Sequence, residues 1–256
     1  METIKFKLSS NMAIIRKPDS NETYYTYNFP HKIMLLGLFG AIIGLNGYNY
    51  YSFQKTLGKK VEELPEFYSE LKNIKIAIVP KIKKENFSRK IQTFNNSVGY
   101  ASKEQGNNLI VKEQWLEKPE WTIFILENEN KNYIKLKDYL LNKKCEYIPY
   151  IGKNDHFADI KDVTIEEAQK IEETPTKIDS LFMEKIAETQ DNILEEILGF
   201  DNSEKTEYFY KELLPVELND KIGYSKFENF VYTNEDLNVE DINNLFKVNN
   251  QNIYYF

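Results

Sequence analysis

A glycine-rich apolar segment, FPHKIMLLGLFGAIIGLNG at residues 29–47, constrains the fold more than any other part of the sequence. The pattern predicts a helix over about residues 32–45, entered through Pro30. Four of the ten glycines in the chain fall in this segment: Gly37, Gly40, Gly44 and Gly47. Their spacing of 3, 4 and 3 residues places them on one helix face. Because glycine costs about 1 kcal/mol relative to alanine in a helix interior, we expect something to approach this face closely.

The sequence argues against two kinds of close neighbour. The apolar run at residues 33–45 is 13 residues long, whereas a bilayer span needs about 20. The segment contains neither GxxxxGKS/T nor GxGxxG, so nucleotide binding of those kinds is not expected. Two neighbours stay open. One is a sheet packed tightly at Gly40 and Gly44, and the other is an RNA backbone at residues 31–37, where the helix start has free N–H groups.

The two halves of the chain differ in charge. Residues 1–112 hold 17 Lys and Arg against 9 Asp and Glu, a net charge of +8, while residues 113–256 hold 16 against 31, a net charge of −15. Charges more than about 8–10 Å apart in solvent are largely screened, so a basic half can attract a polyanion while an acidic half faces elsewhere. An ordinary globular protein with an acidic solvated face fits the same numbers.

Alternating and periodic patterns predict an α+β fold. Strands are predicted at residues 5–8, 24–28, 73–80, 121–127 and 146–151, and helices at residues 32–45 and 132–142. Counted without the short strand at residues 24–28, the order strand, helix, strand, strand, helix, strand is that of a ferredoxin-like domain, which we place at residues 1–163. An acidic region at residues 164–256 follows. We expect one or two amphipathic helices at residues 166–198 and strands at 207–215, 225–232 and 251–256.

A basic insertion at about residues 86–115 separates the second and third strands. Residues 88–97 and 108–114 are predicted to form the arms of a long hairpin with its tip at 98–107. Its lysines and arginine alternate with aromatic residues and short polar side chains. Cations follow a phosphate chain, and an aromatic ring stacks on a splayed base for about 1–3 kcal/mol. The alternative is an edge hairpin kept soluble by lysine.

Cysteine and histidine usage argues against a metal centre. The single Cys145 excludes an internal disulfide and fits a reducing cytosol, and no targeting segment is evident, so we expect a cytoplasmic protein. His31 and His156 lie far apart in the sequence, so we expect no zinc site and no cofactor. His31 beside Lys32 could serve metal-free RNA cleavage. We favour the simpler interpretation that His31 hydrogen-bonds at a helix N-terminus.

Several sequence pieces together resemble the fifth-numbered Cas family of CRISPR-associated proteins, within the RAMP superfamily and in a type I-B-like form. The pieces are TYNFP, LLGLFGAIIGL, NNLIVKEQWL, WTIFIL, YIPYIGKNDHFADI, ELLPVEL and FVYT. The resemblance covers most of the chain and is most specific in the glycine-rich segment and in YIGKNDHFA. It is weakest at residues 166–198. The residues at 31–34 depart from the proline or small polar residues that many relatives have before this helix.

The resemblance implies a fold and a role. It implies a ferredoxin-like RNA-recognition domain with an inserted thumb at about residues 89–112, in a type I surveillance complex, Cascade. The subunit caps the 5′ handle of the CRISPR RNA, contacts the backbone and large subunits, and meets target DNA through the complex. Gly37 and Gly40 belong to the glycine-rich motif. One branch of the family cleaves CRISPR RNA with a tyrosine, lysine and histidine set, which has no residue-by-residue match here.

We therefore expect a non-catalytic RNA-binding subunit. The alternatives are a metal-independent endoribonuclease that processes CRISPR repeat RNA through His31, and a protein–protein scaffold whose lysines only keep it soluble. The candidate RNA contacts are Arg16, His31, Lys32, Gly37, Gly40, Lys83, Lys84, Arg89, Lys90, Asn95, Tyr100, Lys103, Asn108 and Lys112.

Overall fold

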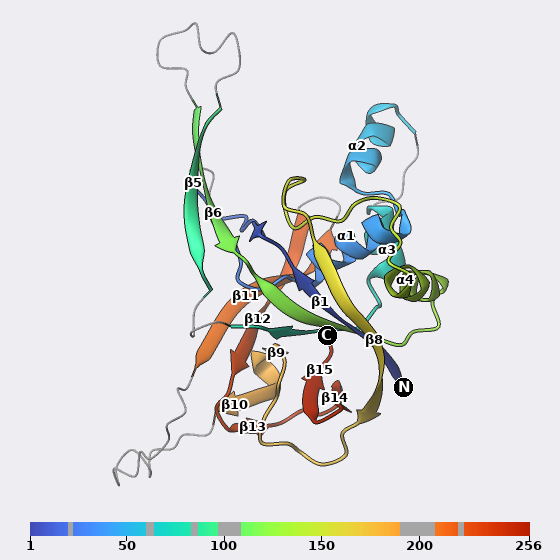
Figure 1. Cartoon of the computed structure of the whole chain (residues 1–256), viewed down its shortest axis with the longest axis vertical. Helices are drawn as coiled ribbons and strands as arrows, with labels where there is room; N and C mark the ends of the chain where they lie inside the picture. Colours follow the sequence, from blue (N-terminus) through green and yellow to red (C-terminus); the bar gives the residue numbers. More distant parts are fainter. Residues whose placement is uncertain (20–22, 60–63, 83–86, 97–108, 190–207, 220–222) are drawn as a thin grey trace, which may run out of the picture.

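The computed structural model describes residues 1–19, 23–59, 64–82, 87–96, 109–189, 208–219 and 223–256 (Figure 1). The fold is α+β, and its C-terminal region is rich in strands, as predicted; most of its sheet pairing is antiparallel. The main sheet has six strands in the order β15-β14-β8-β1-β7-β4. These strands are β1 (Glu2–Ser9), β4 (Ile76–Pro80), β7 (Glu120–Leu126), β8 (Asp159–Lys170), β14 (Leu245–Val248) and β15 (Gln251–Tyr254). Each neighbouring pair is antiparallel.

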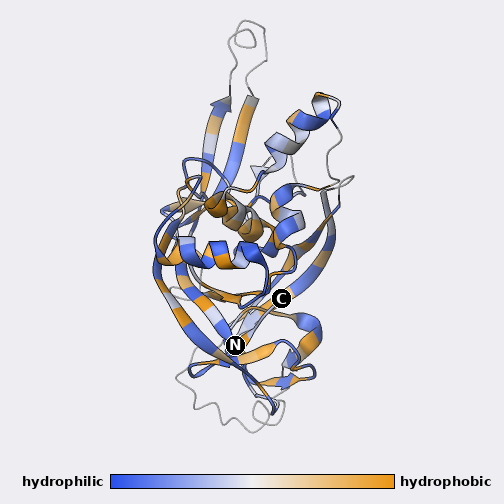
Figure 2. Ribbon diagram, turned by 90° about the vertical axis from the view of Figure 1, so that its right-hand side faces the viewer, coloured by the Kyte–Doolittle hydropathy of each residue, from blue (hydrophilic) through white to orange (hydrophobic). Residues whose placement is uncertain are grey.

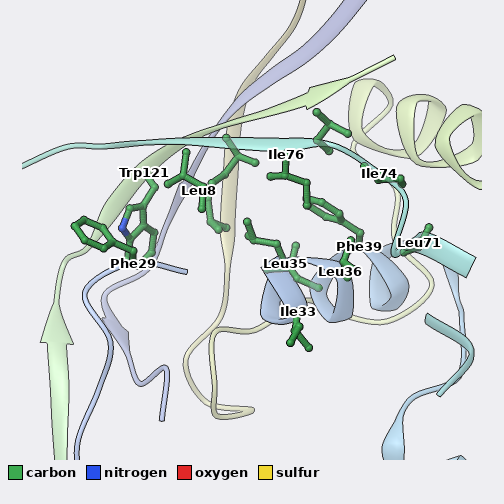
Figure 3. Packing of buried hydrophobic residues seen from close by; sticks show 14 of the residues in the cluster. Leu8, Phe29, Ile33, Leu35, Leu36, Phe39, Leu71, Ile74, Ile76 and Trp121 are labelled. Carbon is green, nitrogen blue, oxygen red and sulfur yellow. The ribbon is translucent and has the colours of Figure 1, made fainter. Parts of the chain in front are cut away.

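Helices pack on one face of this sheet and on each other. The four helices of the described chain are α1 (Lys32–Ile43), α2 (Tyr48–Thr56), α3 (Glu66–Leu71) and α4 (Lys131–Leu141). Helix α1 packs against α3 and α4. Figure 3 shows Leu35, Leu36 and Phe39 of α1 beneath Leu8 and Ile76 of the sheet. The sheet therefore buries the apolar face of α1, which explains why so hydrophobic a segment is stable here.

Strand β7 is apolar because both of its faces are covered. Trp121 and Ile123 face the core shared with α1, whereas Phe124 and Leu126 pack in a second cluster with Tyr255 and its neighbours. A strand buried on both faces loses the usual alternation of apolar and polar residues. Strand β1, in contrast, alternates, and its Ile4, Phe6 and Leu8 are fully buried.

A smaller sheet holds the inserted hairpin. Its strands are β2 (Met12–Ala13), β3 (Thr23–Tyr24), β5 (Arg89–Asn96) and β6 (Leu109–Glu117). Strands β5 and β6 are antiparallel, and β6 pairs with β2 and β3 near its base. The hairpin projects from the body of the molecule in Figure 1. The sequence predicted both arms of this hairpin as far as they are described, and its predicted tip at residues 98–107 lies outside the described part of the chain.

The C-terminal region forms its own antiparallel layer. It comprises β9 (Phe182–Met183), the 3₁₀ helix η2 (Glu184–Ile186), β10 (Ala187–Thr189), β11 (Phe209–Asn219), β12 (Gly223–Thr233) and β13 (Leu237–Val239). Strands β11, β12 and β9 are hydrogen-bonded in that order, and β10 pairs with β13. The strands predicted at 207–215, 225–232 and 251–256 are confirmed by β11, β12 and β15, and residue 207 lies outside the described part.

Two predicted elements are wrong. Residues 146–151 form no strand, and Tyr150 makes only an isolated bridge with Phe157. The N–H groups of Glu146 and Tyr147 instead donate to the carbonyls of Ile42 and Ala41 at the end of α1. The fourth strand of the helix-bearing sheet is β8, which lies further along the chain.

The helices predicted at residues 166–198 are also wrong as far as residue 189, and residues 190–198 lie outside the described part. Strand β8 runs through Lys170, because its backbone pairs with β1 on one side and β14 on the other. Sheet pairing therefore outweighs the helical period of the apolar residues. The predicted domain boundary between residues 163 and 164 falls inside β8, so both predicted regions contribute to the main sheet.

The structure contains no single described helix that is long and apolar enough to cross a membrane. Helices α1 and α2 together have the length and apolar composition of such a span, but they are bent by 83° relative to one another.

Candidate nucleic-acid interface

The two faces of the β5–β6 hairpin differ in exposure. Side chains along β5 alternate between exposed and half-buried from Arg89 to Asn95, because successive residues of a strand point to opposite faces. Figure 2 shows hydrophilic and hydrophobic bands along the projecting hairpin. The cross-strand register then assigns each β6 residue to one of these faces. We call them the open face and the covered face.

The open face consists of Arg89, Ile91, Thr93, Asn95, Ile110, Lys112 and Gln114. Thr93 pairs with Lys112 and Asn95 with Ile110, so polar, cationic and apolar side chains lie next to one another. Ile91 is 54% exposed and Ile110 is 59% exposed. At the base of this face, Arg89 donates a hydrogen bond to the side-chain oxygen of Asn28. The open face therefore offers two cations and two apolar side chains to a ligand or partner.

The covered face is occupied by a loop at residues 151–157. Lys153 forms an ion pair of 2.9 Å with Glu113 of β6 and lies over the Phe94 ring, 4.7 Å from its centroid. Glu113, which is 7% exposed, also accepts a hydrogen bond of 2.8 Å from the Trp115 Nε1. Lys90 lies 5.3 Å from the Trp115 ring centroid. This arrangement neutralises Lys153 and keeps Trp115 away from solvent.

His156 closes the covered face. Its ring packs edge-on against Trp115 at 4.5 Å between centroids, and neither ring nitrogen has a hydrogen-bond partner among the described residues. Burial lowers the pKa of His156. A neutral imidazole is therefore favoured at this position, and His156 adds no positive charge to the hairpin.

The glycine stripe of α1 packs against α3. A Cβ atom on Gly40 would lie 2.6 Å from the Cβ of Phe67, and one on Gly37 would lie 3.8 Å from the Phe67 ring. Gly44 has φ +82° and ends α1 in the left-handed region, where its close neighbour is the Glu146 side chain. The close approach anticipated from the sequence is thus a protein contact. Gly40 is buried by it, which leaves no room for an RNA backbone at that residue.

His31 is the N-cap of α1 and is buried. It is 2% exposed, and its Nδ1 accepts a hydrogen bond of 3.2 Å from the Met34 N–H. The ring also packs edge-on against Tyr27 and Tyr224. Burial lowers the pKa of His31 to about 3, so the ring is neutral at pH 7. The geometry fits the interpretation of His31 as a helix cap. Its buried ring is not accessible to RNA.

The remaining candidates are not brought into one site. Arg16 is exposed and its guanidinium lies 3.6 Å from the centroid of the Tyr24 ring, near the base of the hairpin. Lys32 is half-buried at the start of α1 and lines a separate cavity. Of the candidates, only Arg89, Asn95 and Lys112 lie together among the described residues, on the open face of the hairpin. Five candidates lie outside the described residues: Lys83, Lys84, Tyr100, Lys103 and Asn108.

Sequence reasoning missed the apolar part of the open face and the role of Lys153. Nothing in the sequence pattern distinguishes the exposed Ile91 and Ile110 from other strand residues. Their position opposite the polar Gln114 and Asn95, on the same face as Arg89 and Lys112, becomes visible only with the β5–β6 register. Lys153 was not singled out, because its partner Glu113 is 40 residues away in the chain.

No metal centre is formed by the described residues, since no group of three or more His, Cys, Asp and Glu side chains in this part is placed to hold an ion. The fold and the interface define an α+β protein with a projecting hairpin that carries cations and apolar side chains on one face.

Comparison with solved structures matches the chain to CRISPR-associated proteins. A CRISPR RNA-guided surveillance complex chain is 12% identical, with a TM-score of 0.48 over 91% of this chain and 90% of that chain. A CRISPR protein from Archaeoglobus fulgidus is 14% identical, with a TM-score of 0.47 over 99% and 98% of the two chains. A chain of the Type III-B Cmr-beta complex bound to cognate target RNA and AMPPnP is 11% identical, with a TM-score of 0.44 over 93% and 85%. No protein-family model and no curated protein sequence matches.

Proposed function

We propose that this chain is a non-catalytic RNA-binding subunit of a type I CRISPR surveillance complex, in the type I-B-like branch of the fifth-numbered Cas family. In this role it caps the 5′ handle of the CRISPR RNA in the cytoplasm. It contacts the backbone and large subunits, and it meets target DNA through the complex. The observation that carries the proposal is the open face of the hairpin, with Arg89, Asn95 and Lys112 beside two exposed isoleucines.

The residues of the open face are better suited to contact with RNA and protein than to exposure to water. Arg89 and Lys112 can follow a phosphate chain, and Asn95 can hydrogen-bond to a base or a ribose hydroxyl. The exposed Ile91 and Ile110 are costly in water and fit a neighbouring protein subunit. On the covered face, Lys153 is neutralised by Glu113 and Lys90 lies over the Trp115 ring, so neither ammonium group is presented as the open-face cations are. The hairpin therefore has the properties expected of a thumb between RNA and an adjacent subunit.

The strand order supports the ferredoxin-like assignment. In chain order, β1, α1, β4, β7, α4 and β8 alternate as strand, helix, strand, strand, helix, strand. In the sheet, the four strands run β8-β1-β7-β4 with antiparallel neighbours. This is the split βαβ arrangement of ferredoxin-like domains. We infer that the hairpin is an insertion into such a domain, between β4 and β7.

The absence of catalysis is part of the proposal. A metal-free ribonuclease needs a general base and a proton donor that reach the scissile phosphate. His31 is instead buried and neutral, and its ring packs against Tyr27 and Tyr224, so it is not accessible to a phosphate. Purified protein incubated with repeat RNA and no divalent metal should leave the RNA intact. Cleavage that disappears in His31→Ala would establish the ribonuclease alternative.

The proposal is tested by purifying the tagged chain from cells that express the CRISPR array and the partner subunits. We expect a complex that contains RNA of guide length and the other subunits, as measured by mass and by RNA extraction. The variant Arg89→Ala, Lys112→Ala should retain less RNA. The control Lys131→Ala, Lys247→Ala removes the same charge from exposed positions on α4 and β14 and should retain the normal amount. A complex without RNA would favour the scaffold alternative.

A further inference from the structure

A cavity of about 490 Å³ lies between the start of α1, the end of α3, the β11–β12 hairpin and η2. Four lysines line it: Lys32, Lys72, Lys185 and Lys226. The rest of its wall combines apolar side chains, among them Leu64, Met183 and Val216, with the polar Asn73, Glu217 and Glu228. None of the open-face residues of the β5–β6 hairpin lines it. Its volume lies within the range of about 300–1,000 Å³ that is usual for small-molecule sites.

The acidic residues of the cavity neutralise only two of the four lysines. Lys185 pairs with Glu228 at 3.1 Å, and Lys226 lies 3.5 Å from both Glu217 and Glu228. Neither Lys32 nor Lys72 forms an ion pair with any residue in the described part of the chain. Among the described residues, the cavity therefore contains two lysine ammonium groups without an ion-pair partner.

Lys32 is the more constrained of these two lysines. It is half-buried in the first turn of α1, where the helix dipole favours an anion and where the chain supplies no acidic residue. Burial, with a smaller contribution from Lys75, lowers the pKa of Lys32 to about 8. Most of the Lys32 side chains are still protonated at pH 7. Partial burial of an unpaired ammonium group costs free energy, and a bound anion would offset this cost.

We propose that this cavity, the lysine pocket, binds the phosphate group of a small phosphate-bearing ligand. A dianionic phosphate matches the two uncompensated cations in charge, and the apolar wall accommodates an organic group such as a nucleoside. A carboxylate would balance only one of the two lysines. The proposal is independent of RNA binding at the open face, because the two sites share no residue.

The test is calorimetric titration of the full-length protein with inorganic phosphate, AMP and adenosine. We expect phosphate and AMP to bind and adenosine to give no signal. Lys32→Met and Lys72→Met should each weaken AMP binding by about tenfold, the usual effect of losing one charge-assisted contact. Lys32→Arg keeps the charge and should retain binding. Lys247→Met, an exposed lysine on β14, is the matched control and should bind AMP normally.

Two results would overturn the proposal. One is the absence of a signal for both phosphate and AMP at about 1 mM, the weak end of specific affinities. The other is AMP binding that is unchanged in Lys72→Met, an exposed substitution that should not affect folding.

Competition then identifies the source of the phosphate. If a 5′-phosphorylated oligonucleotide displaces AMP and its 5′-hydroxyl form does not, the pocket binds the phosphorylated end of a nucleic acid. If neither oligonucleotide displaces AMP, the pocket binds a free nucleotide. Normal salt dependence of RNA binding in Lys72→Met separates this site from the open face.

Discussion

At the scale of single residues, the glycines of α1 are not equivalent. Gly40 faces the Cβ of Phe67, which is fixed to the α3 backbone and cannot swing away. Gly37 faces the edge of the same ring at an ordinary contact distance. One helix face thus contains one glycine that the packing requires and one that it does not.

This difference predicts opposite effects for one substitution. Gly40→Ala should lower the free energy of unfolding by about 1–3 kcal/mol, the usual cost of overpacking a core. Gly37→Ala should leave it unchanged or raise it by up to about 1 kcal/mol through helix propensity. Urea unfolding of both variants at pH 7 measures the difference. Equal effects would mean that Phe67 does not set the close approach.

His31 predicts a pH dependence of stability. Its pKa is about 3 in the folded protein and about 6.5 in the unfolded chain, so the unfolded state binds the extra proton between these values. His31 therefore stabilises the fold above pH 6.5, and this contribution falls as the pH decreases towards 3. Between pH 7 and pH 5 the loss is about 2 kcal/mol for this residue.

The variant His31→Asn isolates this term, because asparagine caps a helix and does not titrate. We expect the variant to be less stable than the wild type at pH 7, since it leaves space beside Tyr27 and Tyr224. It should lose less stability than the wild type between pH 7 and pH 5 in urea unfolding. Parallel pH curves would contradict a buried, neutral His31.

At the scale of elements, the loop at residues 151–157 supports one face of the hairpin. Gly152 has φ +85°, and a Cβ there would lie 1.6 Å from the Ile14 carbonyl oxygen. Gly152→Ala should therefore destabilise the protein by at least about 2 kcal/mol, since clash and backbone strain act together. It should also displace Lys153 and His156 and expose Trp115, which a red shift in fluorescence would report.

Gly58 supplies the matched control for this prediction. It also has a positive φ, +67°, but a Cβ there would meet nothing within 4 Å. Gly58→Ala should cost only the strain of about 1–2 kcal/mol and should leave the emission unchanged. An unshifted spectrum in Gly152→Ala would show that the loop does not depend on this close approach.

The sequence predicted elements well where one local pattern decides them. The period of α1, the apolar run of β7 and the alternating arms of β5 and β6 are of this kind. It failed for residues 146–151 and 166–189, where the outcome depends on distant partners. The backbone of residues 146–147 caps α1, and β8 pairs with strands from both ends of the chain.

The same limit applies to the candidate site. Residue types identified the hairpin, but the division of Arg89 and Lys90 between two faces needed the register with β6. The burial of His31 depends on Tyr224, which is 193 residues away. A helix N-terminus with a nearby tyrosine cluster could not, from sequence alone, be told from a surface site.

At the scale of the whole molecule, the two predicted regions are joined by shared structure. Strands β14 and β15 extend the sheet of β1 and β8, and one core cluster combines Leu36 and Phe39 with Leu214 and Phe230. Glu212 of β11 is buried, pairs with Lys17 at 2.9 Å and accepts the N–H of Asn28. The acidic C-terminal region therefore shares one sheet and one hydrophobic core with the basic N-terminal residues.

This arrangement predicts a single unfolding transition. Far-ultraviolet circular dichroism and tryptophan fluorescence should give coincident urea curves, as expected for a cooperative unit. A fragment of residues 1–163 lacks β14, β15 and the C-terminal half of β8, so it should not show a cooperative transition. Two separated transitions in the full chain would instead support independent domains on either side of residue 163.

The central claim is that the open face of the hairpin binds single-stranded RNA through its cations. The most direct measurement is the salt dependence of binding to a short handle-like RNA, for the wild type and for the variant Arg89→Ala, Lys112→Ala. Each lost phosphate contact should reduce the log–log slope by about 0.7, so we expect a reduction of roughly 1.4 in the variant. The control Lys131→Ala, Lys247→Ala should keep the wild-type slope. Equal slopes in all three proteins, or an equal loss in both variants, would contradict the assignment of RNA binding to the open face.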